Sequence, residues 1–150
     1  MKINMLIIAA LATYSLTTNA ISDKDKEQMM SLMKDASPYV AGMGKSVDEV
    51  CSDLANDMVK KYGNQLSGTG KSPSDIRDSA SGICLDAAST ASSAQSIDEV
   101  SMWKKSAMQN INQTFHGESS PARDFLIETI EHSEKMAKPI AYMMELSKKQ

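Results

Sequence analysis

Apolar residues recur at steps of three and four along most of the chain, and this spacing limits the possible folds more than any other feature. The four stripes are Val47, Val50, Cys51, Leu54, Met58 and Tyr62; Ile76, Ala80, Ile83, Cys84, Ala87 and Ala91; Ile97, Val100, Ala107, Met108, Ile111 and Phe115; and Leu126, Ile130, Ala137, Ile140, Ala141 and Met144. No stretch alternates apolar and polar residues for long enough to indicate a strand. The pattern therefore predicts an all-α fold.

The stripes and the helix starts and ends predict five helices at about 23–34, 47–64, 73–92, 97–116 and 121–148. We expect these helices to form one compact antiparallel bundle. Pro139 should kink or divide the last helix near Lys138, because proline cannot donate the backbone hydrogen bond and its ring crowds the preceding turn.

Several helix starts can be read directly from the sequence. SVDEV at 46–50 and SIDEV at 96–100 both place Ser at the N-cap and Glu three residues later, which is the pattern of a capping box. Ser-Pro at 72–73 and at 120–121 predicts two further starts, because the first helical position needs no backbone N–H. Residues 35–46 contain proline and glycine and predict an irregular connection.

The stretch SGTGKS at 67–72 resembles the end of a nucleotide-binding P-loop. That motif requires a glycine five residues before its Gly-Lys-Ser end, and Gln65 stands there. The run before it is an amphipathic helix, whereas a P-loop follows a strand. We therefore expect no nucleotide binding and predict a turn, with Gly63 or Gly68 ending one helix and Ser72 capping the next.

The first twenty residues have the layout of a secretory signal peptide. Lys2 precedes a mostly apolar run at 5–16, and small residues at Thr18 and Ala20 suit cleavage after Ala20. A run of this length falls short of the roughly 20 residues that span a bilayer, so we expect no stable membrane anchor. The prediction is a secreted protein, periplasmic in a Gram-negative source, with residues 21–150 as a single domain.

Cys51 and Cys84 are the two cysteines, and each lies on the apolar stripe of a predicted helix. In an exported chain two such cysteines favour one disulfide. A bridge closing this loop of about 33 residues would stabilise the fold by roughly 3–4 kcal/mol. A redox or nucleophilic thiol is the alternative, but such thiols are usually exposed beside positive charge, and Asp53 lies close to Cys51.

The charge balance and the residue types narrow the function. The net charge is −3 and becomes −4 once Lys2 is removed, so no basic face is expected for nucleic acid or for an anionic membrane. Glu128 and His132 lie four residues apart, but His116 has no matching carboxylate, which predicts a solvated pair instead of a metal site. No local pattern supplies a nucleophile with its base, and we expect neither catalysis nor a cofactor.

Apolar residues on more than one face of the last helix indicate a candidate binding surface. It consists of Phe125, Ile127, Tyr142 and Met143. The chain also contains 12 methionines, whose flexible thioethers suit adaptable surfaces and also fill cores.

Two functions remain open at this point. The first is an exported, non-catalytic bundle that binds another protein as an inhibitor, adaptor or accessory factor. The alternative is a carrier of a small apolar ligand inside the bundle. A sequon at Asn112 would be glycosylated only in a eukaryotic source, which the sequence does not identify.

Overall fold

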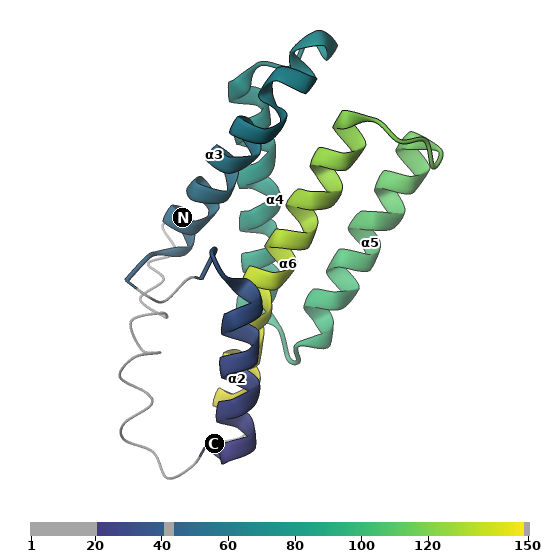
Figure 1. The fold of residues 1–150 in the computed structure, drawn as a ribbon. Helices are drawn as coiled ribbons and strands as arrows, with labels where there is room; N and C mark the ends of the chain where they lie inside the picture. Colours follow the sequence, from purple (N-terminus) through teal and green to yellow (C-terminus); the bar gives the residue numbers. More distant parts are fainter. Residues whose placement is uncertain (1–20, 41–43, 149–150) are drawn as a thin grey trace.

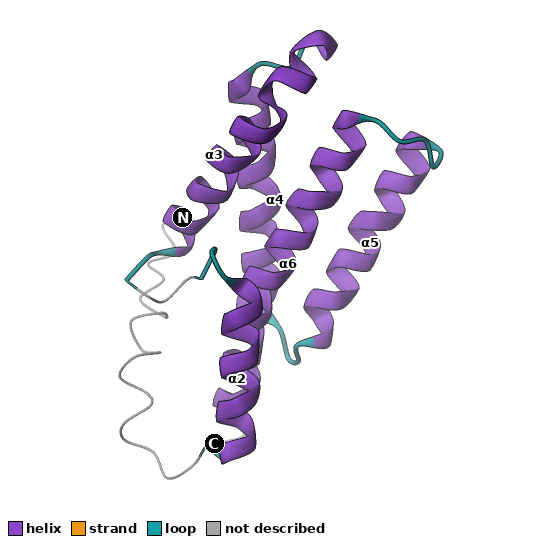
Figure 2. Cartoon of the chain, viewed as in Figure 1, coloured by secondary structure: helices purple, strands orange, loops and turns teal. Residues whose placement is uncertain are grey.

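The computed structural model describes residues 21–40 and 44–148, which form α-helices and one short 3₁₀-helix joined by turns (Figures 1 and 2). The elements in chain order are α2 (Asp23–Ala36), α3 (Val47–Leu66), η1 (Ser67–Thr69), α4 (Pro73–Ser93), α5 (Asp98–Phe115) and α6 (Pro121–Lys148). The predicted all-α bundle is confirmed, and the helix bounds agree with the sequence-based ones to within about two residues. The predicted signal peptide and its cleavage after Ala20 lie outside the described residues.

Helix α6 is the centre of the bundle. It packs against α2, α3, α4 and α5, and α3 and α4 also pack against each other (Figure 1). Helix α2 runs antiparallel to the C-terminal half of α6, because Asp25 lies beside Tyr142 while Leu32 lies beside Lys138. The apolar residues on several sides of α6 therefore belong to its contacts with four neighbours. Pro139 is buried within this helix, which is continuous through it and not divided.

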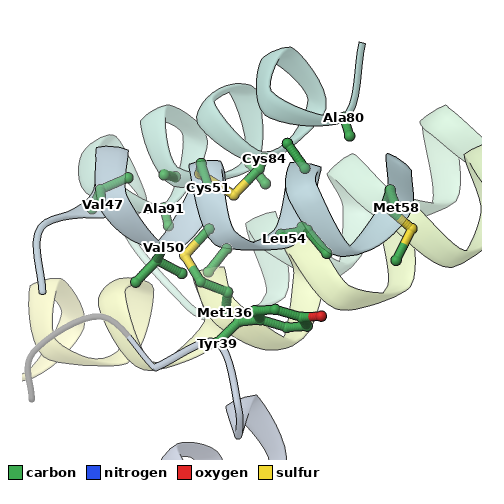
Figure 3. Packing of buried hydrophobic residues seen from close by; sticks show 14 of the residues in the cluster. Tyr39, Val47, Val50, Cys51, Leu54, Met58, Ala80, Cys84, Ala91 and Met136 are labelled. Atoms are coloured by element: carbon green, nitrogen blue, oxygen red, sulfur yellow. A yellow bond between two sulfur atoms is a disulfide. The ribbon is translucent and has the colours of Figure 1, made fainter. Parts of the chain in front are cut away.

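The predicted disulfide joins α3 to α4. Cys51 and Cys84 are both completely buried, and their Cα atoms lie 5.5 Å apart, a usual distance for a bridge. Figure 3 shows the bridge among Val47, Val50 and Leu54 of α3. The side of α4 that faces the core is built largely from alanines, which lets the neighbouring backbones approach closely.

One of the two predicted capping boxes forms and the other does not. The Ser46 hydroxyl accepts a hydrogen bond from the Glu49 N–H, and the Glu49 carboxylate accepts one from the Ser46 N–H. At the second site Ser96 does not cap α5, and Glu99 accepts from the Gln95 N–H at 2.6 Å instead.

The C-terminal part of α6 contacts the segment before α5. There Glu145 accepts a hydrogen bond from the Ile97 N–H, and Lys148 donates one to the Ala94 carbonyl. The connection from α4 to α5 is thus held to α6 by tertiary contacts, which a local sequence pattern does not contain.

The SGTGKS stretch is the turn between α3 and α4. Ser72 caps α4 with Pro73 at the first helical position, and the Asp75 carboxylate accepts a hydrogen bond from the Ser72 N–H, which completes a capping box. The glycine that turns the chain is Gly70, with φ of +76°, and not Gly63 or Gly68. Helix α3 continues past Gly63 to Leu66, and the 3₁₀ turn η1 follows it, so the left-handed conformation is needed only at Gly70.

Candidate functional site

The surface residues predicted from sequence do not form a surface patch. Phe125 is only 5 % exposed and packs edge-on against Tyr62 of α3, and Tyr142 is only 3 % exposed. Ile127 and Met143 are partly buried. The prediction is wrong for Phe125 and Tyr142, because an α-helix surrounded by four neighbours is apolar on more than one side without leaving those side chains free.

The structure points instead to the contact between α2 and α6, which we name the α2–α6 seam. The apolar residues of α2 that are buried or partly buried are Met29, Leu32, Met33 and Ala36, and they share one helix face at the spacing of an amphipathic stripe. Because α2 packs against α6, we assign this face to the seam. Ala36 is the one residue of α2 that is buried, while the other three are partly buried. Met30 lies beside this stripe and is exposed. The helix is therefore held by a thin apolar contact and leaves methionine side chains within reach of solvent.

A hydrogen bond closes the N-terminal end of the seam. The Tyr142 hydroxyl donates to the Asp25 carboxylate at 2.7 Å. Burial of the Tyr142 phenol, together with this bond and the negative charge of Asp25, raises its pKa to about 12. The phenol therefore remains protonated, and able to donate, at physiological pH.

A shallow pocket of about 230 Å³ lies along the same seam, lined by Leu32 and Asp35 of α2 and by Glu134, Lys135 and Lys138 of α6. Glu134 is buried and forms ion pairs with Lys104 of α5 at 2.7 Å and with Lys138 at 2.9 Å. Burial alone would raise the pKa of Glu134. The hydrogen bonds from the two lysines have the larger, opposite effect, so the pKa lies below its ordinary value.

A second polar cluster lies between α3, α6 and the segment that follows α2. Tyr39 donates to Asp57 at 2.8 Å, Tyr62 donates to Glu128 at 2.6 Å, and the Tyr39 ring contacts the His132 ring edge-on. Burial raises the pKa of both tyrosines above the usual range, and the hydrogen bonds to carboxylates raise it further.

This second cluster revises the prediction for Glu128 and His132. The His132 Nε2 and Glu128 Oε1 atoms are 3.7 Å apart, and both side chains are partly buried, so the pair is less solvated than the sequence indicated. Glu128 also accepts hydrogen bonds from Lys61, which offset the effect of burial and leave its pKa below the ordinary value.

A pocket of about 270 Å³ adjoins the second cluster and is lined by Pro38, Tyr39, Lys45, Asp53, Asn56, Asp57 and Lys60. Its charged groups pair with one another, Lys45 with Asp53 and Lys60 with Asp57. These groups satisfy each other, and the arrangement indicates a structural contact more than a binding site.

Sequence reasoning missed the α2–α6 seam because the signal for it is short. Half of the residues in the predicted helix at 23–34 are charged, its methionines are few, and its sequence does not indicate that α6 is its partner.

The Asn112 side chain lies on α5 and accepts a hydrogen bond from Arg123 at 3.2 Å.

The described part of the chain contains no helix that is both long and apolar enough to cross a membrane. Within residues 21–40 and 44–148 no three His, Cys, Asp or Glu side chains gather in a way that could hold a metal ion. Comparisons with protein-family models, with curated proteins and with solved structures gave no match to this chain.

Proposed function

We propose that this chain is an exported, non-catalytic helical bundle that binds another protein as an inhibitor, adaptor or accessory factor, and that it does so through α2. The observation that carries the proposal is the attachment of α2, which packs on α6 and buries a single residue of its own. Met29, Leu32 and Met33 stay partly exposed beside the exposed Met30. Methionine-rich surfaces of this kind adapt to partner side chains, because the thioether chain is flexible and polarisable.

Export is supported by the signal-like first twenty residues and by the buried disulfide, since disulfides persist in oxidising compartments. The test is to express the full chain in the source cells and to sequence the N-terminus of the protein recovered outside the cytoplasm. We expect the recovered chain to begin at Ile21. A chain that stays inside the cytoplasm and begins at Met1 would contradict export.

The binding proposal is tested by comparing two exposed methionines on different helices. A photo-crosslinking amino acid is placed at position 30 of α2 or at position 102 of α5, and the protein is irradiated in the compartment into which it is exported. We expect a discrete crosslinked protein from position 30 and none from position 102. The captured protein is then purified and titrated against the wild-type chain by calorimetry.

Matched charge substitutions decide whether the captured protein binds at α2. Met30→Lys should weaken the measured affinity by about tenfold or more, because the lysine charge would need to be desolvated in the interface. Met102→Lys should leave the affinity within about twofold. Equal effects of both substitutions, or equal crosslinking at both positions, would count against α2 as the binding surface.

The alternative of an apolar-ligand carrier gains no support from the two pockets described above. Both lie at the surface of the bundle, and charged or polar side chains supply most of their linings.

A further inference from the structure

Among the residues that the structure describes, the methionines differ sharply in exposure. Met30 on α2 is 64 % exposed and Met102 on α5 is 59 % exposed. Met58 and Met136 lie in the core, at 2 % and 1 %. Met29 and Met33 are between these extremes, partly buried in the α2–α6 seam.

Exposure governs how quickly a thioether meets an oxidant. With hydrogen peroxide the sulfur lone pair attacks one oxygen, the O–O bond breaks, and an S–O bond forms. The other oxygen leaves as hydroxide and takes the proton from the attached oxygen, which yields methionine sulfoxide and water. The reaction consumes one peroxide for each methionine and requires no other reagent.

The consequence of the reaction depends on where the sulfur lies. Most of Met30 and of Met102 is exposed, so a sulfoxide oxygen there can be hydrated. A sulfoxide at Met29 or Met33 puts a polar oxygen into an apolar contact, where burial without a hydrogen-bond partner is unfavourable. Helix α2 buries only Ala36, so it has little other apolar contact with which to hold its place.

We propose that α2 is an oxidation-sensitive latch, in which Met30 takes up oxidant first and oxidation of Met29 and Met33 releases α2 from α6. The core methionines stay reduced while this occurs, because α3, α4 and α6 cover them. Release exposes the C-terminal half of α6, while the disulfide keeps α3 and α4 together. The latch does not depend on the identity of any binding partner.

The test uses the full chain, treated with increasing hydrogen peroxide. Peptide mass spectrometry measures the oxidation of each methionine, and hydrogen exchange is then measured over residues 23–36 and 47–66. We expect Met30 and Met102 to oxidise first, Met29 and Met33 next, and Met58 and Met136 last. Once Met29 and Met33 are oxidised, exchange in α2 should become at least tenfold faster, while exchange in α3 stays within twofold.

Two variants separate the latch from general oxidative damage. Met29→Leu/Met33→Leu keeps the apolar volume and removes the two partly buried sulfurs of α2, while Met143 and Met144 of α6 keep theirs. Peroxide should then no longer accelerate exchange in α2. Met102→Leu removes an exposed sulfur on another helix, and its α2 should respond as in the wild type. Methionine sulfoxide reductases should restore the protection of α2 in the oxidised wild-type protein.

Three results would overturn the proposal. The first is unchanged exchange in α2 when Met29 and Met33 are fully oxidised. The second is oxidation of Met58 or Met136 as early as that of Met30. The third is an α2 whose amides are already unprotected in the reduced protein, because a helix that is not held cannot be released.

Discussion

The contact between α3 and α4, which the Cys51–Cys84 disulfide crosses, is here called the α3–α4 seam. It and the α2–α6 seam join helices in the same bundle, yet they differ in almost every contribution to stability. Helix α3 buries eight residues and α4 buries six, and a fully buried disulfide joins them. Helix α2 buries one residue, is held by partly exposed thioethers, and adds one hydrogen bond from Tyr142. Because local stability follows buried apolar contact, α2 should open far more often than the rest of the molecule unfolds. The molecule thus combines a disulfide-bonded, well-packed core with one weakly packed helix.

The largest expected effect on stability comes from the α3–α4 seam. The double substitution Cys51→Ala/Cys84→Ala removes the bridge and should lower the free energy of unfolding by about 3–4 kcal/mol, because the unfolded chain regains the entropy of a loop of about 33 residues. Urea denaturation followed by circular dichroism measures the change. A loss below about 1 kcal/mol would show that the packing of α3 against α4 holds the core without the bridge.

Glu134 tests whether a charged group that lines the α2 pocket belongs to the core. Its ion pair with Lys104 joins α5 to α6, so Glu134→Gln should lower the free energy of global unfolding by about 2 kcal/mol at neutral pH. An effect confined to faster exchange in α2 would place Glu134 with the α2–α6 seam instead.

The same variant should show a specific pH dependence. The pKa of Glu134 is lowered in the folded state, so its stabilising contribution is present above the unfolded pKa of about 4.3 and is lost as pH falls through the folded pKa. The difference in unfolding free energy between the wild type and Glu134→Gln should therefore shrink between pH 5 and pH 3. A constant difference over this range would mean that the carboxylate charge is not what stabilises the contact.

Two tyrosines make the same kind of hydrogen bond, one in the core and one at the α2–α6 seam. Tyr62 and Tyr142 each donate to a carboxylate, at 2.6 and 2.7 Å, but the first joins α3 to α6 and the second joins α2 to α6. Tyr62→Phe should lower the free energy of global unfolding by about 1 kcal/mol, a typical value for one hydrogen bond. Tyr142→Phe should leave global unfolding almost unchanged and accelerate hydrogen exchange in α2 by roughly fivefold, the factor for about 1 kcal/mol of local opening.

In the wild-type protein, alkaline pH should accelerate hydrogen exchange in α2 as Tyr142→Phe does at neutral pH. The pKa of Tyr142 is raised to about 12 in the folded protein. The stability that its hydrogen bond gives to α2 is therefore fully present below the unfolded pKa of about 10 and is lost as pH rises through about 12. Helix α2 should lose protection in this window before α3 does. Simultaneous loss in both helices would contradict the separate opening of α2.

The sequence predicts the fold well and the candidate site poorly, for physical reasons that particular residues illustrate. Helix periodicity is local, so the stripe from Val47 to Tyr62 and the Ser46 cap can be read without knowing any neighbour. The same spacing at Ser96 gives no capping box, and in this turn Glu99 accepts from the Gln95 N–H while Glu145 of α6 accepts from the Ile97 N–H, a tertiary contact that the local pattern does not reveal. The apolar faces of α6 were assigned to a surface, because periodicity shows that Tyr142 must be covered but not that Asp25 and α2 cover it.

The smallest effect on global unfolding should come from Ser22→Ala, which is compared with Ser46→Ala because both serines are N-caps. Ser22 and Ser46 each accept a hydrogen bond from the backbone N–H three residues later, at 3.2 Å in both cases. Ser46→Ala should lower the free energy of global unfolding by about 1 kcal/mol, as is typical for loss of an N-cap. Ser22→Ala removes the same bond, but α2 already opens in the folded protein, so the cap contributes to local opening and not to the global transition. The urea midpoint of Ser22→Ala should therefore match that of the wild type, while exchange at the N-terminus of α2 becomes severalfold faster. Equal shifts of the midpoint in the two variants would mean that α2 unfolds together with the core, which would remove the distinction between the seams.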